Sequence, residues 1–229
     1  MWYKKSLAIK EKEGNEQEVA GTYHQLGNIA EKKRDLEGAE MWYKKSLAIK
    51  EKEGDEHGAV ITYNQLGIVT YWREDLKEAE MWCKKSLAVS EKEGNEHGVA
   101  VACHQLGCIA EKRRNLEGAE MWYKKSLAIS EKEGNKRGVA STYNQLGEIA
   151  VKKKNFLYAA KYCLKAIVTF NQINDIRNVE LTIDNYARLL HIAPDAERRK
   201  LWEMLPENIS REVTKILEEM EVDANDSRK

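Results

Sequence analysis

Amide and imidazole side chains recur along the chain at a fixed spacing of 40 residues. Each recurring glutamine stands directly before a Leu-Gly pair: Gln25, Gln65, Gln105 and Gln145. A glutamine side chain carries two N–H donors and one oxygen acceptor, so a row of them can pair with the backbone of a bound peptide whatever its sequence. The alternative is that near-identical repeats copy the residue and that each glutamine bonds a neighbouring helix. The sequence leaves both interpretations open.

The other reactive residue types indicate neither catalysis nor a metal site. His24 and His104 stand 80 residues apart without a third ligand, and no Cys-x-x-Cys pair occurs. No nucleophile elbow, phosphate-binding glycine loop, His-Glu-x-x-His motif or dinucleotide fingerprint is present. We therefore expect no enzyme activity, no metal and no cofactor. The unpaired cysteines favour a reduced, cytoplasmic compartment, and three of them, which replace tyrosine in core columns, are expected to be inert: Cys83, Cys103 and Cys163.

The composition favours helices and argues against two classes of partner. Lys plus Arg and Asp plus Glu both number 38, so the formal net charge is zero. That balance gives no long-range attraction to nucleic acid or to an anionic membrane. Residues 1–193 contain no proline, and no apolar run approaches the ~20 residues that span a bilayer. We expect neither a nucleic-acid nor a membrane partner.

The elements that must position these side chains follow from the repeat itself. The string MWYKKSLAI begins at residues 1, 41 and 121, with the variant MWCKKSLAV at 81. Within each unit, apolar and small residues recur at i, i+3, i+4 and i+7, as in Tyr63, Leu66, Gly67 and Thr70, which is one stripe of an amphipathic helix. A second stripe follows in the same unit, so each unit is predicted to hold two helices.

Turn signals share the 40-residue period. Residues suited to an N-cap precede the second helix of each unit: Asp35, Asp75, Asn115 and Asn155. Residues suited to a left-handed C-cap follow that helix: Gly14, Gly54, Gly94, Gly134 and, in the glycine position of the last unit, Asn174. Each glycine is followed by an Asn or Asp that can cap the next helix.

The pattern Tyr-x-x-Leu-Gly, then Asp-Leu-x-x-Ala and Tyr-x-x-Ser-Leu, resembles the tetratricopeptide repeat. The 40-residue spacing is similar to that of the longer-repeat subgroup seen in kinesin light chains and spindle adaptors. The resemblance implies an all-α fold, a right-handed α-α superhelix of antiparallel helix pairs. The family often has a proline at the end of the second helix, whereas Glu51, Glu91 and Glu131 stand in that stretch here. We therefore expect the second helix to run on by about a turn.

The repeat divides the chain into three predicted parts. Residues 1–14 match 41–54 and form an orphan second helix of a truncated repeat. Residues 15–174 form four 40-residue units. Residues 175–229 hold a divergent fifth repeat and C-terminal capping helices, which seal the end of the array.

The resemblance also implies a binding groove, because first helices line the concave face of such arrays. Carried over to this sequence, the groove positions form columns beside the Leu-Gly pairs. The first column is Gln25, Gln65, Gln105, Gln145 and Asn185. The second includes His24, Asn64, His104 and Asn144, and further positions are Asn28 and Tyr71. With glutamine in place of asparagine, the first column resembles the asparagine ladder of kinesin light chains.

Three functions follow as hypotheses. The first is a scaffold or adaptor that binds a peptide or extended protein segment in the groove. The second is a structural self-assembly module, a homo-oligomer that stacks through its terminal helices and the exposed half-repeat at residues 1–13. The third is the sensor or regulatory fragment of a larger protein. Groove substitutions should abolish the first function, and edge substitutions the second.

Overall fold

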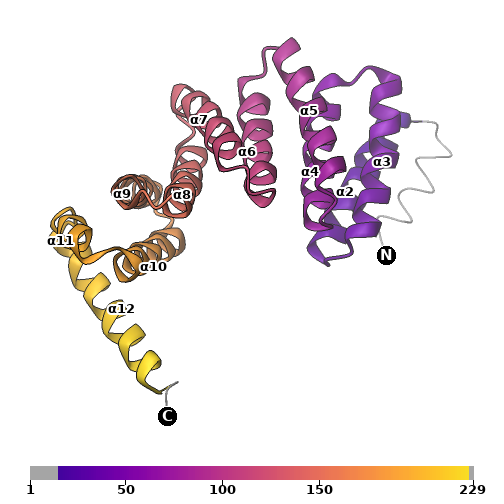
Figure 1. Ribbon diagram of the computed structural model, residues 1–229. Coiled ribbons are helices and arrows are strands. Elements are labelled where there is room, and N and C mark those ends of the chain that lie inside the picture. The colour runs from indigo at the N-terminus through magenta and orange to yellow at the C-terminus, as the bar shows by residue number, and fades with distance from the viewer. Residues whose placement is uncertain (1–14, 227–229) are drawn as a thin grey trace. The chain divides into compact units, whose positions relative to one another are not determined.

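The computed structural model describes the backbone of residues 15–226 and the side chains of residues 15–220. Within that range it holds eleven helices and no strand (Figure 1). The first helices of the repeats are α2 (Glu16–Lys32), α4 (Glu56–Trp72), α6 (Glu96–Lys112), α8 (Lys136–Lys152) and α10 (Ile176–Ile192). The second helices are α3 (Leu36–Glu53), α5 (Leu76–Lys92), α7 (Leu116–Lys132) and α9 (Phe156–Gln172), and α11 (Asp195–Glu203) and α12 (Glu207–Asp226) follow. The predicted all-α class is confirmed, and Glu51, Glu91 and Glu131 lie inside the second helices as expected.

The predicted caps are present at both kinds of helix boundary. Asp35 Oδ1 accepts the backbone N–H of Gly38 at 2.9 Å, and the other second helices described here have the same type of cap. Three of the expected glycines adopt the left-handed conformation: Gly54, Gly94 and Gly134, with φ of 69, 66 and 69°. Asn174 does the same at φ 54°. Gly14 lies outside the described residues.

The turn inside each helix pair also contains a left-handed residue, which the sequence pattern does not predict. These residues carry large charged side chains: Arg34, Glu74, Arg114 and Lys154, with φ of 60, 65, 61 and 56°. Residues with a Cβ ordinarily avoid this region, so charged residues in these positions give no signal of it. The backbone hydrogen bond from Asp35 N to Ala30 O, at 2.9 Å, closes one such turn.

The chain divides into two compact units. Unit 1 is Met1–Arg113, which contains α2 to α6, and unit 2 is Arg114–Lys229, which contains α7 to α12. In unit 1, α2 pairs with α3 and α4 with α5, while α6 packs against both α5 and α4. In unit 2, α8 pairs with α9, α7 packs on α8, and α10 packs on both α9 and α12. Each unit has apolar clusters of its own, because no pair buries its stripe without a neighbour.

Small residues set how closely the paired helices approach. A Cβ at Gly27 would lie 2.4 Å from the ring of Tyr43, and one at Gly67 would lie 2.7 Å from Cys83 Sγ. The Leu-Gly pair of the repeat therefore makes room for the side chain of the second helix. Ala79 is fully buried at the same crossing in unit 1.

Candidate functional site

The glutamine column lies against neighbouring helices more than in open solvent. Gln25 is exposed, whereas Gln65, Gln105 and Gln145 are half-buried. Gln105 Oε1 accepts the Cys83 thiol at 3.0 Å, and its Nε2 donates to the backbone oxygen of Asn64 at 3.4 Å. In unit 2, Gln145 Oε1 accepts the Tyr123 hydroxyl at 3.4 Å. These contacts match the alternative that the sequence left open, in which the amide bonds a neighbouring helix, and the peptide-binding role of the column stays a prediction.

The second column faces the next first helix. The Asn144 amide lies 3.2 Å from the hydroxyl of Thr182, which belongs to α10. In unit 1, Asn64 Oδ1 is buried without a hydrogen-bond partner, as is His24 Nδ1. Burial lowers the pKa of His104 and, with the charge of Lys50 as a second cause, lowers that of His24 to about 4. Both imidazoles are therefore neutral at pH 7.

The two further predicted positions also make internal contacts. Asn28 Oδ1 accepts the Tyr43 hydroxyl at 2.7 Å, within one helix pair. Tyr71 is half-buried, and the ammonium of Lys112 lies 5.2 Å from the centre of its ring. Asn185 is half-buried on α10, in unit 2. The predicted columns therefore divide. Four members bond a neighbouring helix: Asn28, Gln105, Asn144 and Gln145. Gln25 is exposed, and three buried atoms have no hydrogen-bond partner in the part of the chain that the structure describes: His24 Nδ1, Asn64 Oδ1 and Gln65 Oε1.

On α4, a different set of side chains could contact a partner protein. Ile61, Ile68, Tyr71 and Trp72 recur at helical spacing on one face, and we call them the α4 stripe. Ile61 is 42% exposed and Trp72 51%. At the positions of Ile61, Ile68 and Trp72, two other first helices carry small, polar or charged residues: Gly21, Asn28 and Lys32 in α2, and Ser141, Glu148 and Lys152 in α8. The remaining two are mixed, with Val101, Cys108 and Lys112 in α6 and Leu181, Arg188 and Ile192 in α10. The predicted site included Tyr71 but missed Ile61, which the comparison of repeats could have identified.

The buried thiols are unsuited to nucleophilic chemistry. Burial raises the pKa of Cys83 and of Cys163 to about 12, so both remain protonated at neutral pH. Among the described residues, no group of three or more His, Cys, Asp or Glu side chains could hold a metal ion. Across residues 15–226, no helix combines the length and the apolar character needed to cross a bilayer.

Comparison with family models identifies the repeats of the chain. Residues 19–57 and residues 58–132 each match a tetratricopeptide repeat model. No curated protein sequence shows significant similarity to the chain. Solved structures provide a further comparison, and their low sequence identity to this chain supports the fold alone.

Three of these structures cover most of the chain. BtubC (BKLC) from P. vanneervenii shares 18% identity at a TM-score of 0.76, over 96% of this chain and 88% of that one. A protein of nearly identical TPR-like repeats from Podosopora anserina shares 14% at a TM-score of 0.67, over 90% of this chain and 97% of that one. A STAND signal-transduction ATPase with a tetratricopeptide repeat sensor from Pyrococcus horikoshii shares 20% at a TM-score of 0.71, over 88% and 33%. These structures share the fold, and by its repeats and the two family-model matches the chain is a tetratricopeptide repeat protein.

Proposed function

We propose that this chain is a cytoplasmic scaffold that binds an extended segment of a partner protein across the α4 stripe and the adjacent face of α6. Tetratricopeptide repeats are generally protein-interaction scaffolds and typically non-catalytic. The observation that carries the proposal is the exposure of two large apolar side chains, Ile61 and Trp72, on one face of a first helix. In both adjacent first helices, a lysine stands at the Trp72 position. Large aromatic and aliphatic side chains of this kind anchor protein partners.

The amide columns have a supporting role in this proposal. Gln105 holds α6 against α4 and α5, because its amide bonds Asn64 O and Cys83 Sγ. The partner segment would then bind through apolar side chains on the α4 stripe. The Lys112 ammonium above Tyr71 offers a cation at one end of the stripe, where it also pairs with Glu74 at 3.0 Å. Direct hydrogen bonds from Gln25, the exposed member of its column, to the partner backbone remain part of the hypothesis.

The test replaces three of the four residues of the α4 stripe with residues that other repeats of the chain carry at the same positions. The variant combines Ile61→Ser, Ile68→Asn and Trp72→Lys, each taken from a sister repeat. The control is Met81→Lys, which alters an exposed apolar residue on a second helix to the residue found at 161. Wild type and both variants are used for affinity capture from the native lysate, followed by mass spectrometry.

We expect a partner that the wild type and Met81→Lys capture and that the α4 variant loses, with unchanged circular dichroism in all three. Since the substituted side chains are exposed or half-buried, each should change the free energy of unfolding by only about 0.5 kcal/mol. Equal capture by the α4 variant would refute binding across the α4 stripe. Capture of further copies of this chain alone would favour self-assembly, whose predicted edge at residues 1–13 lies outside the described residues.

A further inference from the structure

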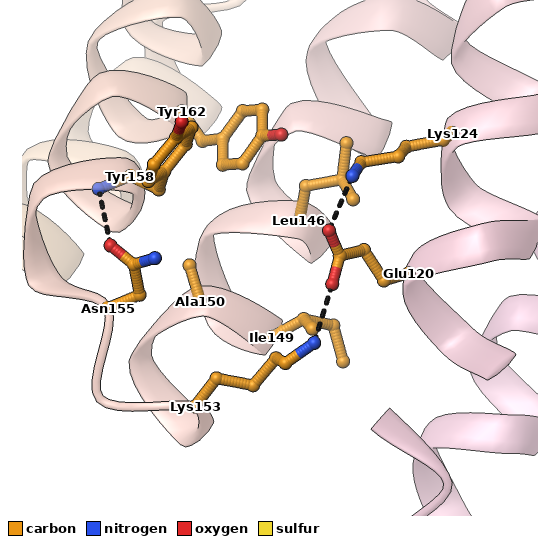
Figure 2. A pocket seen from close by; sticks show the side chains of 9 residues that line it. All are labelled: Glu120, Lys124, Leu146, Ile149, Ala150, Lys153, Asn155, Tyr158 and Tyr162. Carbon is orange, nitrogen blue, oxygen red and sulfur yellow. Dashed lines mark hydrogen bonds and ion pairs between the residues drawn. The ribbon is translucent and has the colours of Figure 1, made fainter. Parts of the chain in front are cut away.

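A pocket of about 370 Å³ lies between α7, α8 and α9 in unit 2 (Figure 2). Its floor is apolar and includes Leu146 and Ile149, and the rings of Tyr158 and Tyr162 form one wall. We call it the α7–α9 pocket. Its volume falls within the range of roughly 300–1,000 Å³ that is usual for small-ligand sites.

The opposite wall of the pocket is charged. Glu120 accepts hydrogen bonds from Lys124 at 2.5 Å and from Lys153 at 2.8 Å (Figure 2). The two lysines therefore share one carboxylate across this wall, and Lys124 is 55% exposed. An ammonium has three donors, so Lys124 can donate to a further acceptor.

The corresponding place in unit 1 shows what such a pocket accommodates. There the indole of Trp82 is 8% exposed and donates its N–H to Glu78 at 3.2 Å. Lys44, the counterpart of Lys124, donates to Glu78 at 2.9 Å as well as to Glu40 at 2.6 Å. A carboxylate and an indole thus fill this junction together.

Unit 2 replaces both of these side chains with tyrosine. Tyr162 stands at the Trp82 position and keeps the ring stack on the first helix, since its ring centre lies 6.0 Å from that of Tyr143, against 5.9 Å for Tyr63 and Trp82. The phenol lacks the second ring of the indole. Tyr158 stands at the Glu78 position and is 53% exposed, so Lys124 lacks the second carboxylate that Lys44 has.

We propose that the α7–α9 pocket binds an aromatic ring that carries, or lies beside, a carboxylate. The ring would lie on Leu146 and Ile149 against the tyrosine wall, where offset aromatic contacts are favourable. The carboxylate would accept from Lys124, as Glu78 accepts from Lys44 in unit 1. Either a free aromatic acid or an acidic residue next to a tryptophan in a peptide has this chemistry.

Two probes distinguish these sources, and a third isolates the charge. Indole-3-propionate represents the free acid, the dipeptide Ac-Glu-Trp-NH2 represents the peptide, and indole-3-propanamide is the neutral isostere. Saturation-transfer NMR on the full chain measures the binding of each probe. For a probe of this size we expect a dissociation constant on the order of 1 mM. The tighter of the two acidic probes identifies the source.

Two variants tie binding to this pocket. The double variant Tyr158→Glu with Tyr162→Trp restores the side chains of unit 1 and should abolish binding of both acidic probes. Because unit 1 already contains that arrangement, the variant should keep the helical circular dichroism and the melting temperature of the wild type. Lys124→Gln should weaken the acidic probes by about two- to fivefold, as expected for a partly exposed ion pair, and leave the propanamide unchanged.

Three results would overturn the proposal or a part of it. If neither acidic probe shows saturation transfer at a concentration several times the expected dissociation constant, the pocket is refuted as a site. Undiminished binding to the Tyr158→Glu, Tyr162→Trp variant would show that the probes bind elsewhere. Equal affinity for the acid and the amide would refute the carboxylate part. None of these results depends on the α4 stripe, so this proposal and the scaffold proposal can fail separately.

Discussion

At the scale of single residues, the environment of His24 links stability to pH. The Lys50 ammonium is half-buried and donates to Gly58 O at 3.1 Å and to Thr62 Oγ1 at 2.9 Å. Burial lowers the pKa of the Lys50 ammonium, and Asp55 partly opposes this. The ring of His24 lies 5.2 Å from that of Tyr43, and burial together with Lys50 lowers the imidazole pKa from 6.5 to about 4. The structure therefore holds His24 neutral beside a cation.

Because the folded state lowers the pKa of His24, the stability of the chain should fall as the pH falls. Below pH 6.5 the unfolded chain protonates His24, while the folded chain remains neutral down to about pH 4. This residue's contribution to stability is complete above pH 6.5 and is lost as the pH falls to 4. We expect a loss of roughly 1–2 kcal/mol over that window, after discounting the shift for partial exposure.

Urea denaturation of wild type and variants at pH 4 to 7 measures this slope. His24→Asn, the residue of the same column at 64 and 144, should remove it. Lys50→Ser, the residue at 90 and 130, should reduce it, because it removes the neighbouring charge and opens the site to water. An unchanged slope in His24→Asn would assign the pH dependence to other groups.

A second residue-scale prediction concerns the buried Asn64 oxygen. In unit 2 the equivalent Asn144 lies 3.2 Å from the Thr182 hydroxyl, 38 residues further on. The residue 38 positions after Asn64 is Ala102, which is fully buried and has no hydroxyl. Ala102→Thr should supply the donor and raise the free energy of unfolding by roughly 0.5–1.5 kcal/mol. Ala102→Val matches its shape without the hydroxyl, so equal stabilisation by Val would show that only volume matters.

At the scale of elements, the left-handed turns inside the helix pairs store strain. Arg34 has φ 60°, which costs a residue with a Cβ roughly 1–2 kcal/mol, whereas glycine adopts it freely. Glycine also adds roughly 0.4–1 kcal/mol of unfolded-state entropy, which offsets part of the gain. We expect Arg34→Gly to stabilise the chain by about 0.5 kcal/mol in calorimetry. Lys33→Gly, one residue earlier at φ −85°, should destabilise it, and the same sign for both would contradict the strain argument.

The sequence predicts the elements that a local pattern determines. The helix periodicity, the Asx caps and the glycine C-caps act within a few residues, so the eleven helices between residues 15 and 226 and the turns at Gly54 and Gly94 could be predicted. The turn at Arg34 could not, because neighbours impose it on a residue that disfavours it. Likewise, the position of Gln105 on α6 could be predicted, but not the direction of its amide toward Cys83, which depends on how far α5 lies from α6.

For the candidate surfaces, too, the sequence identifies positions but not the packing around them. Near-identity of the repeats made the glutamine column conspicuous, but the informative positions are those where one repeat departs from the others. Trp72 and Tyr158 are such departures, and both are more than half exposed. The sequence alone shows that they differ. The packing of the helices around them decides that Trp72 is open to a partner and that Tyr158 borders a pocket.

At the scale of the molecule, each pair in a repeat protein depends on a neighbour to cover its apolar face. In unit 2, α12 provides this cover for α10. Val213 is fully buried and Ile209 is 6% exposed, in one cluster with Ile183 and Tyr186 of α10. The predicted capping role of the segment after residue 174 therefore has a specific contact that can be broken.

We expect Val213→Asp to undock α12 and to destabilise the chain by roughly 3–5 kcal/mol, because a carboxylate cannot remain in that apolar cluster. Amide hydrogen exchange should then accelerate in α10 as well as in α12, since α10 loses its cover. Thr214→Asp places the same charge on the exposed side of α12 and should change the free energy of unfolding by about 0.5 kcal/mol or less. If α10 kept its protection in Val213→Asp, the repeat would be stable without α12, and α12 would be free to serve as a docking element rather than as a cap.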